Sequence, residues 1–142
     1  MHHVTDSLLV GNLDDARNPP GFIGGLLFVA EEHQVAPPEG LLYERIPLKE
    51  FGEADPGDLA RGVAWLERYG PTNRVMVCCR AGMGRSVSMV IAYLCCVKGM
   101  SYAEALRLLR ARRPGATPLP NLEQTIEQVR RLREGRSGSD HA

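Results

Sequence analysis

The feature that most constrains this 142-residue chain is an apolar segment that runs into a glycine-containing loop and then into an apolar helix. Residues 74–79 read Arg-Val-Met-Val-Cys-Cys, which is apolar enough for a strand buried on both faces. Residues 85–98 are apolar on nearly every side, which predicts a central helix. The loop between them directs its backbone N–H groups and the positive end of the helix at a common point. Such a loop binds an anion, and phosphate most readily.

The rest of the chain alternates between strand-like and helix-like segments. Shorter apolar runs predict strands at residues 7–10, 26–30 and 41–46, the first followed by a turn at Gly11-Asn12. Helical spacing of apolar residues predicts helices at 58–69, 105–112 and 121–133, the second opened by a capping box at 101–104. This alternation implies one α/β domain around a central sheet, with residues 1–134 folded and residues 135–142 a flexible tail. His2 and His3 are also expected to be disordered.

Charge and cysteine usage narrow the class of protein. Lys plus Arg and Asp plus Glu both number 17, so a general nucleic-acid or membrane-surface binder is not expected. No apolar run approaches the roughly 20 residues of a membrane-spanning helix, and the N-terminus lacks the pattern of a secretory signal. The four cysteines form two adjacent pairs without C-x-x-C spacing, which favours neither disulfides nor a zinc site. We therefore expect a cytoplasmic monomer without metal, nucleic-acid or membrane partners, whose cysteines other than Cys79 are buried apolar residues.

Two side chains frame the anion-binding loop. Cys79 opens it and Arg85 closes it, so a closed loop could place the sulfur below a bound phosphate and the guanidinium beside it. The loop N–H groups, the helix end and Arg85 all favour the thiolate, which is the nucleophilic form. Ser86 can donate a hydrogen bond to the sulfur when it becomes the leaving group. The predicted phosphate-binding residues are Arg80, Ala81, Gly82, Met83, Gly84 and Arg85.

This pattern resembles the protein tyrosine phosphatase loop, H-C-x-x-G-x-x-R-[ST]. Cys79, Gly82, Arg85 and Ser86 match four of its positions, in the strand–loop–helix context that the chemistry requires. Cys78 stands where the family has His. Because a cysteine replaces that residue's hydrogen bonds poorly, we expect a weaker nucleophile that still reacts.

The resemblance extends over about residues 7–132 and is greatest to the small dual-specificity phosphatases. Segments similar to theirs are found at residues 8–13, 43–48, 91–94, 101–105, 113–116 and 120–122. It implies a twisted mixed sheet covered by helices on both faces. It also implies a two-step mechanism through a phosphocysteine, without metal or other cofactor.

The family donates a proton to the leaving group from an Asp in the loop after the Ile-Pro strand. Glu50 aligns with that position, 29 residues before Cys79. Asp55 is the alternative, because it has the family's residue type and such loops vary in length, and Glu53 is third. All three could instead be solvated loop charges.

Three further positions carry open alternatives, and two more have a single expectation. Gln124 could position the water that attacks the phosphocysteine, or it could be a surface residue of the last helix. Arg112 and Arg113 could add positive field to the pocket, or they could be exposed residues at a helix end. His33 is expected at the surface, and Trp65 is expected in the core.

The resemblance implies hydrolysis of phosphotyrosine, and of phosphoserine or phosphothreonine, on a phosphoprotein or phosphopeptide. Lipid-directed relatives tend to carry extra lysines inside this loop, whereas here only Arg80 is basic between Cys79 and Arg85, so the resemblance favours phosphoprotein over lipid. The first alternative is a binding module that holds phosphate without turnover, motivated by Cys78 and by the open assignment of the acid. The second is a rhodanese-like sulfurtransferase, whose Cys-to-Arg loop is one residue shorter.

Overall fold

The computed structural model describes the fold of residues 1–141 and the side chains of residues 1–135. A five-stranded sheet lies at its centre, in the order β1-β2-β5-β3-β4. β1 pairs antiparallel with β2, and the other neighbours are parallel. The strands are β1 (His2–His3), β2 (Leu8–Gly11), β3 (Gly25–Phe28), β4 (Leu42–Arg45) and β5 (Val75–Cys78).

β5 occupies the middle of the sheet because it is apolar on both faces. All four of its residues are buried, and Val77 pairs with Val10 on one side and Leu27 on the other. β2, β3 and β5 run in the same direction, so their carboxyl ends meet at one edge. Cys79 follows β5 directly at that edge.

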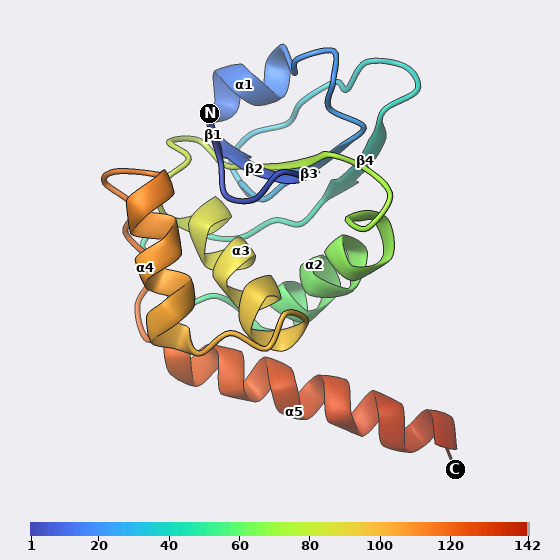
Figure 1. The fold of residues 1–142 in the computed structure, drawn as a ribbon, viewed down its shortest axis with the longest axis vertical. Coiled ribbons are helices and arrows are strands. Elements are labelled where there is room, and N and C mark those ends of the chain that lie inside the picture. Colours follow the sequence, from blue (N-terminus) through green and yellow to red (C-terminus); the bar gives the residue numbers. More distant parts are fainter. Residues whose placement is uncertain (142) are drawn as a thin grey trace.

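Helices cover the sheet on both sides, as Figure 1 shows. α2 to α5 gather on one side, and α1 lies on the other together with connecting loops. The helices are α1 (Leu13–Arg17), α2 (Pro56–Tyr69), α3 (Arg85–Cys96), α4 (Tyr102–Arg112) and α5 (Leu122–His141). This architecture confirms the predicted α/β domain with a mixed central sheet. No helix in the described part of the chain is both long and apolar enough to cross a bilayer.

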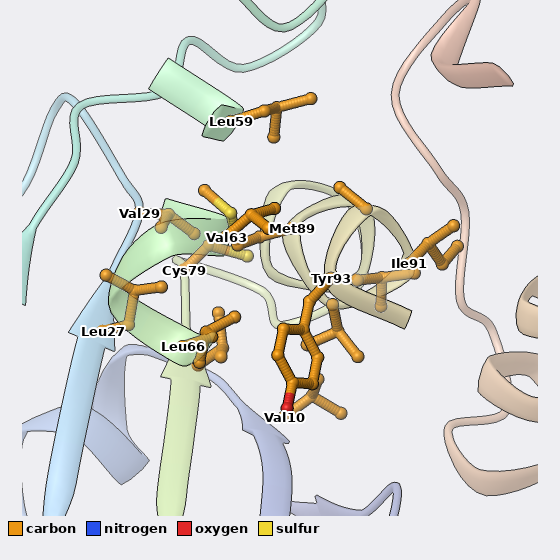
Figure 2. Close-up of a cluster of buried hydrophobic side chains, with 14 of the residues drawn as sticks. Val10, Leu27, Val29, Leu59, Val63, Leu66, Cys79, Met89, Ile91 and Tyr93 are labelled. Atoms are coloured by element: carbon orange, nitrogen blue, oxygen red, sulfur yellow. The ribbon is translucent and has the colours of Figure 1, made fainter. Parts of the chain in front are cut away.

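α3 is the central helix of the core. Every residue from Arg85 to Cys95 is buried. Its Met89, Ile91 and Tyr93 lie in the same apolar cluster as Val63 and Leu66 of α2 (Figure 2). Burying each large apolar side chain stabilises the fold by roughly 1.5–3 kcal/mol. The helix that begins at Arg85 is therefore firmly anchored.

The predicted strands and helices are found within a few residues of their expected bounds, and Ser101 forms the predicted capping box with Glu104. The N-terminus differs. His2 and His3 were expected to be disordered, which is wrong, because they form β1 against Leu9 and Val10. The turn at Gly11-Asn12 opens a short helix, since Asn12 forms a capping box with Asp15.

The last helix also exceeds its predicted end. α5 continues to residue 141, beyond the boundary at residue 133. Residues 134–141 include the strong helix formers Glu and Arg as well as the Gly and Ser that suggested a tail. Most of the predicted tail, residues 136–142, lies outside the part of the chain whose side chains are described.

Candidate active site

The loop after β5 curls around the sulfur of Cys79. The Gly82 N–H donates to Cys79 Sγ at 3.2 Å, and Ser86 Oγ lies 3.3 Å from the same sulfur. Only 2% of Cys79 is exposed, yet it lines a cavity of about 400 Å³ together with Arg85. A thiolate at this position would have hydrogen-bond donors on its inner side and an open space on its outer side.

Gly82 is the residue that lets the loop close. Its φ is +72°, a left-handed conformation that glycine adopts without a steric penalty. A Cβ at this position would lie 2.5 Å from Arg113 Nη2 and 2.6 Å from the Gly11 carbonyl oxygen. The loop therefore fits against its surroundings only with glycine here.

Arg113 supports the loop from behind. Its Nε donates to the Gly82 carbonyl at 3.1 Å and its Nη2 to the Ala81 carbonyl at 3.4 Å, and the residue is 5% exposed. The sequence left open whether Arg112 and Arg113 lie near the pocket or at the surface. Arg113 is buried against the loop, whereas Arg112 is exposed. Arg113 thereby fixes the carbonyls of Ala81 and Gly82 and, with them, the course of the loop.

The N-terminal strand contacts this support. His2 Nδ1 lies 2.8 Å from Arg113 Nη1. Desolvation and the positive charge of Arg113 lower the pKa of His2, which favours the neutral ring that can accept a hydrogen bond. β1 thereby connects residue 2 to the loop that follows β5.

Arg85 is held in place by Glu32, a residue that the sequence analysis did not single out. Nη1 donates to Glu32 Oε1 at 2.5 Å and to the Leu48 carbonyl at 3.1 Å, and Nη2 donates to Glu32 Oε2 at 2.8 Å. The side-chain hydrogen bond from Arg85 lowers the pKa of Glu32 to about 2. Burial opposes the positive charge on Arg85, but hydrogen bonding to Glu32 and its charge raise the pKa of the guanidinium.

The contacts with Glu32 and Leu48 also determine which part of Arg85 remains for a ligand. They engage three of the five N–H groups of the guanidinium. Nε–H and the second Nη2–H lie on another edge of the fork, where two oxygens of one anion could be bound. Glu32 follows β3, whose carboxyl end meets that of β5, but this pairing of strands leaves no local signal in the sequence.

The structure separates the three acid candidates. Glu50 lines the cavity, with Oε1 3.2 Å from Arg80 Nη2 and Oε2 4.0 Å from Arg85 Nη2. Asp55 is the N-cap of α2 and accepts from the Asp58 N–H at 3.0 Å. Glu53 accepts from Asn121 Nδ2 at 2.7 Å. Glu50 is the only one of the three that lines the cavity of Cys79.

The remaining predicted positions lie away from the sulfur. Gln124 is exposed on α5 and does not line the cavity. Trp65 is half-buried against the core, with its ring 5.2 Å from that of Tyr69. His33 is half-buried rather than fully at the surface, and its carbonyl accepts from Arg45 Nε at 3.3 Å.

The other cysteines are packed side chains. Cys78 and Cys95 are buried and Cys96 is half-buried, and all are free thiols. Burial raises the pKa of Cys78 well above its usual range and that of Cys95 to about 11. Within the described residues, no group of three or more His, Cys, Asp or Glu is placed to hold a metal ion.

The walls of the cavity are largely apolar. They are formed by Glu50, Phe51, Cys79, Ala81, Met83, Gly84, Arg85 and residues 117–120. A larger cavity of about 600 Å³ lies at the opposite edge of the sheet, near Leu8 and Tyr93. The smaller cavity is the candidate active site, because a possible nucleophile, a cation and a carboxylate meet there.

Comparison with known sequences places the chain beside phosphatases. The family model described as the dual specificity phosphatase catalytic domain matches residues 34–132. The chain is 38% identical over 146 residues to dual specificity protein phosphatase 1B of Arabidopsis thaliana, covering 95% of this chain and 84% of the relative. It is 42% identical over 133 residues to dual specificity protein phosphatase 15 of Mus musculus, covering 90% of this chain and 57% of the relative. The chain thus spans little more than half the length of the second relative.

Solved structures share the fold. Human DUSP28 matches with a TM-score of 0.77 at 22% identity, covering 96% of this chain and 99% of that one. DUSP15 matches with a TM-score of 0.78 at 25% identity, covering 94% of each chain. PTPMT1 matches with a TM-score of 0.75 at 21% identity, covering 97% of this chain and 98% of that one.

Proposed function

The chain belongs to the dual specificity phosphatase family of protein phosphatases, and from this premise we propose that it hydrolyses phosphomonoesters on proteins through a phosphocysteine at Cys79. One observation carries the proposal. The sulfur of Cys79 receives the Gly82 N–H at 3.2 Å and lies beside Ser86 Oγ, at a cavity that Arg85 also lines. These groups are the ones that the first chemical step requires.

In the first step the Cys79 thiolate attacks phosphorus in line. The S–P bond forms while the P–O bond to the substrate breaks. Loop N–H groups and the free edge of Arg85 hold the equatorial oxygens as charge develops on them. Glu50, in its acid form, exchanges its contact with Arg80 for the leaving oxygen and donates its proton.

In the second step water attacks the phosphocysteine. The S–P bond breaks, phosphate is released and Glu50 accepts the proton of the water. The departing thiolate is stabilised by the Gly82 N–H and by a hydrogen bond from the Ser86 hydroxyl. No metal ion takes part in this sequence.

The proposal is tested with phosphotyrosine, phosphoserine and phosphothreonine peptides in the presence of a chelator. We expect native protein to release phosphate from phosphotyrosine peptide, and Cys79→Ser to release none. Acid quench of the native enzyme on ³²P-labelled peptide should trap label on Cys79. Activity that appears only with added metal, or a Cys79→Ser variant with native activity, would overturn the proposal. Tight peptide binding without turnover at any pH would identify a binding module instead.

A further inference from the structure

A second cavity lies around Leu8, the first residue of β2, at the edge of the sheet opposite Cys79. Its volume is about 600 Å³, and it has no lining residue in common with the cavity of Cys79. α3 connects the two, because Arg85 at its start lines the first cavity and Tyr93 lines the second, about 12 Å further along the helix. A volume of this size is typical of small-molecule sites in proteins. The proposed phosphatase reaction makes no use of this space.

Much of the wall of this cavity is apolar. It is formed by side chains from β2, α2, α3, α4 and the segment after α3, namely Leu8, Leu66, Leu94, Met100 and Leu108. Leu8, Leu66 and Leu94 are buried in the core, whereas Met100 and Leu108 are half-buried and pack against it. Because the core holds this wall in place, an apolar ligand could be buried against it without rearranging the fold.

The hydroxyl of Tyr93 is the polar group best placed for a ligand. It lies at the end of a ring that extends from α3 (Figure 2). The residue is 6% exposed, yet its hydroxyl forms no hydrogen bond with any residue that the structure describes. Every fully enclosed side-chain polar atom in that part of the chain has a partner, so this hydroxyl opens to the cavity that Tyr93 lines. A Cβ at Gly70, another lining residue, would lie 3.6 Å from the hydroxyl oxygen. Since nearly all buried hydroxyls are hydrogen-bonded, Tyr93 has a donor to offer to a bound molecule.

Two charged residues line the cavity, Lys98 and Asp6. The Lys98 ammonium lies 6.0 Å from the centre of the Tyr93 ring and forms no ion pair within the described residues. Lys98 and Tyr93 thus provide a cation and a hydroxyl donor within a short distance of each other. Together they favour an anionic group with two acceptor oxygens, such as a carboxylate. Asp6 is exposed and would oppose such a group, so removing its charge should not weaken binding.

We propose that this cavity binds a small amphipathic carboxylate, whose head contacts Lys98 and Tyr93 and whose aliphatic body lies against the leucine and methionine wall. The cation selects a negative head, and the apolar wall selects a body of several carbons. The site is separate from the proposed catalytic cavity, and it does not depend on turnover there.

The test uses native protein labelled with ¹³C at its methionine methyl groups, with decanoate as the probe. Decanoate should shift the Met100 resonance saturably and leave that of Met83, at the catalytic cavity, unchanged. Acetate, which has the head without the body, should give no shift at the same concentration. Excess inorganic phosphate should not displace decanoate, because it would bind the loop after β5. Absence of a saturable shift at Met100, or displacement by phosphate, would overturn the proposal. A Met100 shift that depends on protein concentration alone would overturn it too, because a second copy would then cover the cavity.

Substitutions test the polar contacts. Tyr93→Phe keeps the ring and should weaken decanoate binding roughly tenfold or more, because a hydrogen bond to a charged group is lost. Tyr102→Phe, at a half-buried tyrosine that does not line the cavity, is the matched control and should keep native affinity. Lys98→Met should weaken binding roughly two- to fivefold, as expected for an exposed ion pair. Asp6→Asn should leave binding unchanged or tighten it. Native affinity in Tyr93→Phe, or weaker binding in Asp6→Asn, would overturn the proposal.

Discussion

Glu32 and Arg85 form a two-point ion pair, with distances of 2.5 and 2.8 Å, although 53 residues separate them in the chain. The Arg85 side chain is 3% exposed, and its guanidinium is held by this carboxylate and by the Leu48 carbonyl. The pair leaves one edge of the fork toward the cavity. We therefore expect Glu32 to position Arg85, the proposed phosphate clamp.

Replacing Glu32 should impair catalysis without removing any group that touches the substrate. Glu32→Gln keeps the shape but loses the charge, so Arg85 should adopt several orientations and kcat/KM should fall roughly 10- to 100-fold. Steady-state kinetics on an aryl phosphate measures the loss. Glu31→Gln, at the exposed neighbour, is the control and should keep native kcat/KM. Native kinetics in Glu32→Gln would contradict the positioning role.

The same ion pair predicts a dependence of stability on pH. Hydrogen bonding to Arg85 lowers the pKa of Glu32 from 4.5 to about 2. A lowered pKa means that the stabilisation is fully present above the unfolded value and is lost as pH falls from about 4.5 toward about 2. The difference in unfolding free energy between native protein and Glu32→Gln should shrink over that window. Chemical denaturation at several pH values measures it, and a constant difference would refute the linkage.

Arg113 should be required for the shape of the loop. Arg113→Ala removes the donors to the Gly82 and Ala81 carbonyls, and an unpaired buried carbonyl costs about 1–3 kcal/mol. We expect a lower melting temperature and a lower kcat. Arg112→Ala, at the exposed neighbour, should change neither. Equal effects of the two substitutions would show that general positive charge matters rather than these hydrogen bonds.

Gly82 and Gly99 form a matched pair for testing how tightly the loop is packed. Both have a φ of +72°, but a Cβ at Gly99 would meet nothing within 4 Å, whereas at Gly82 it would overlap Gly11 and Arg113. Gly99→Ala should lower the free energy of unfolding by roughly 1–2 kcal/mol from backbone strain alone. Gly82→Ala should lower it further and abolish turnover, which denaturant unfolding and steady-state kinetics measure. Similar unfolding free energies for the two variants would argue against the close contact.

Substitutions at Glu50 and Asp55 should have different effects on kcat, because only Glu50 is placed to donate the proton. Glu50→Gln removes the carboxyl at the cavity and should lower kcat about 10²- to 10⁴-fold on substrates with a poor leaving group. The loss should be smaller with nitrophenyl phosphate, whose leaving group needs no proton. Asp55→Asn should keep native kcat and stability, because Asn also caps a helix well. A larger loss in Asp55→Asn would reverse the assignment.

The sequence by itself determined much of this protein. The four residues before Cys79 are all apolar, and the stretch after Arg85 is apolar on nearly every side. Because neither segment has a polar face for solvent, the first requires a buried strand and the second a buried helix. The α/β fold follows from that pattern and from the alternation around it. The spacing of Cys79, Gly82, Arg85 and Ser86 indicated a phosphate-binding loop with a cysteine nucleophile. A loop of that length at the start of a helix is suited to holding an anion.

Only the tertiary structure decided which distant residues complete the site. Glu32 meets Arg85 because parallel strands end at one edge of the sheet, and Arg113 meets the loop from the end of α4. His2 meets Arg113 because β1 pairs beside β2. None of these relations leaves a local pattern in the sequence. Glu50, Glu53 and Asp55 have similar sequence surroundings, but the fold gives each a different contact. Glu50 pairs with Arg80 at the cavity, Glu53 accepts a hydrogen bond from Asn121, and Asp55 caps α2. Periodicity reports burial along one segment, whereas a site is assembled from contacts between segments, and those contacts exist only once the chain has folded.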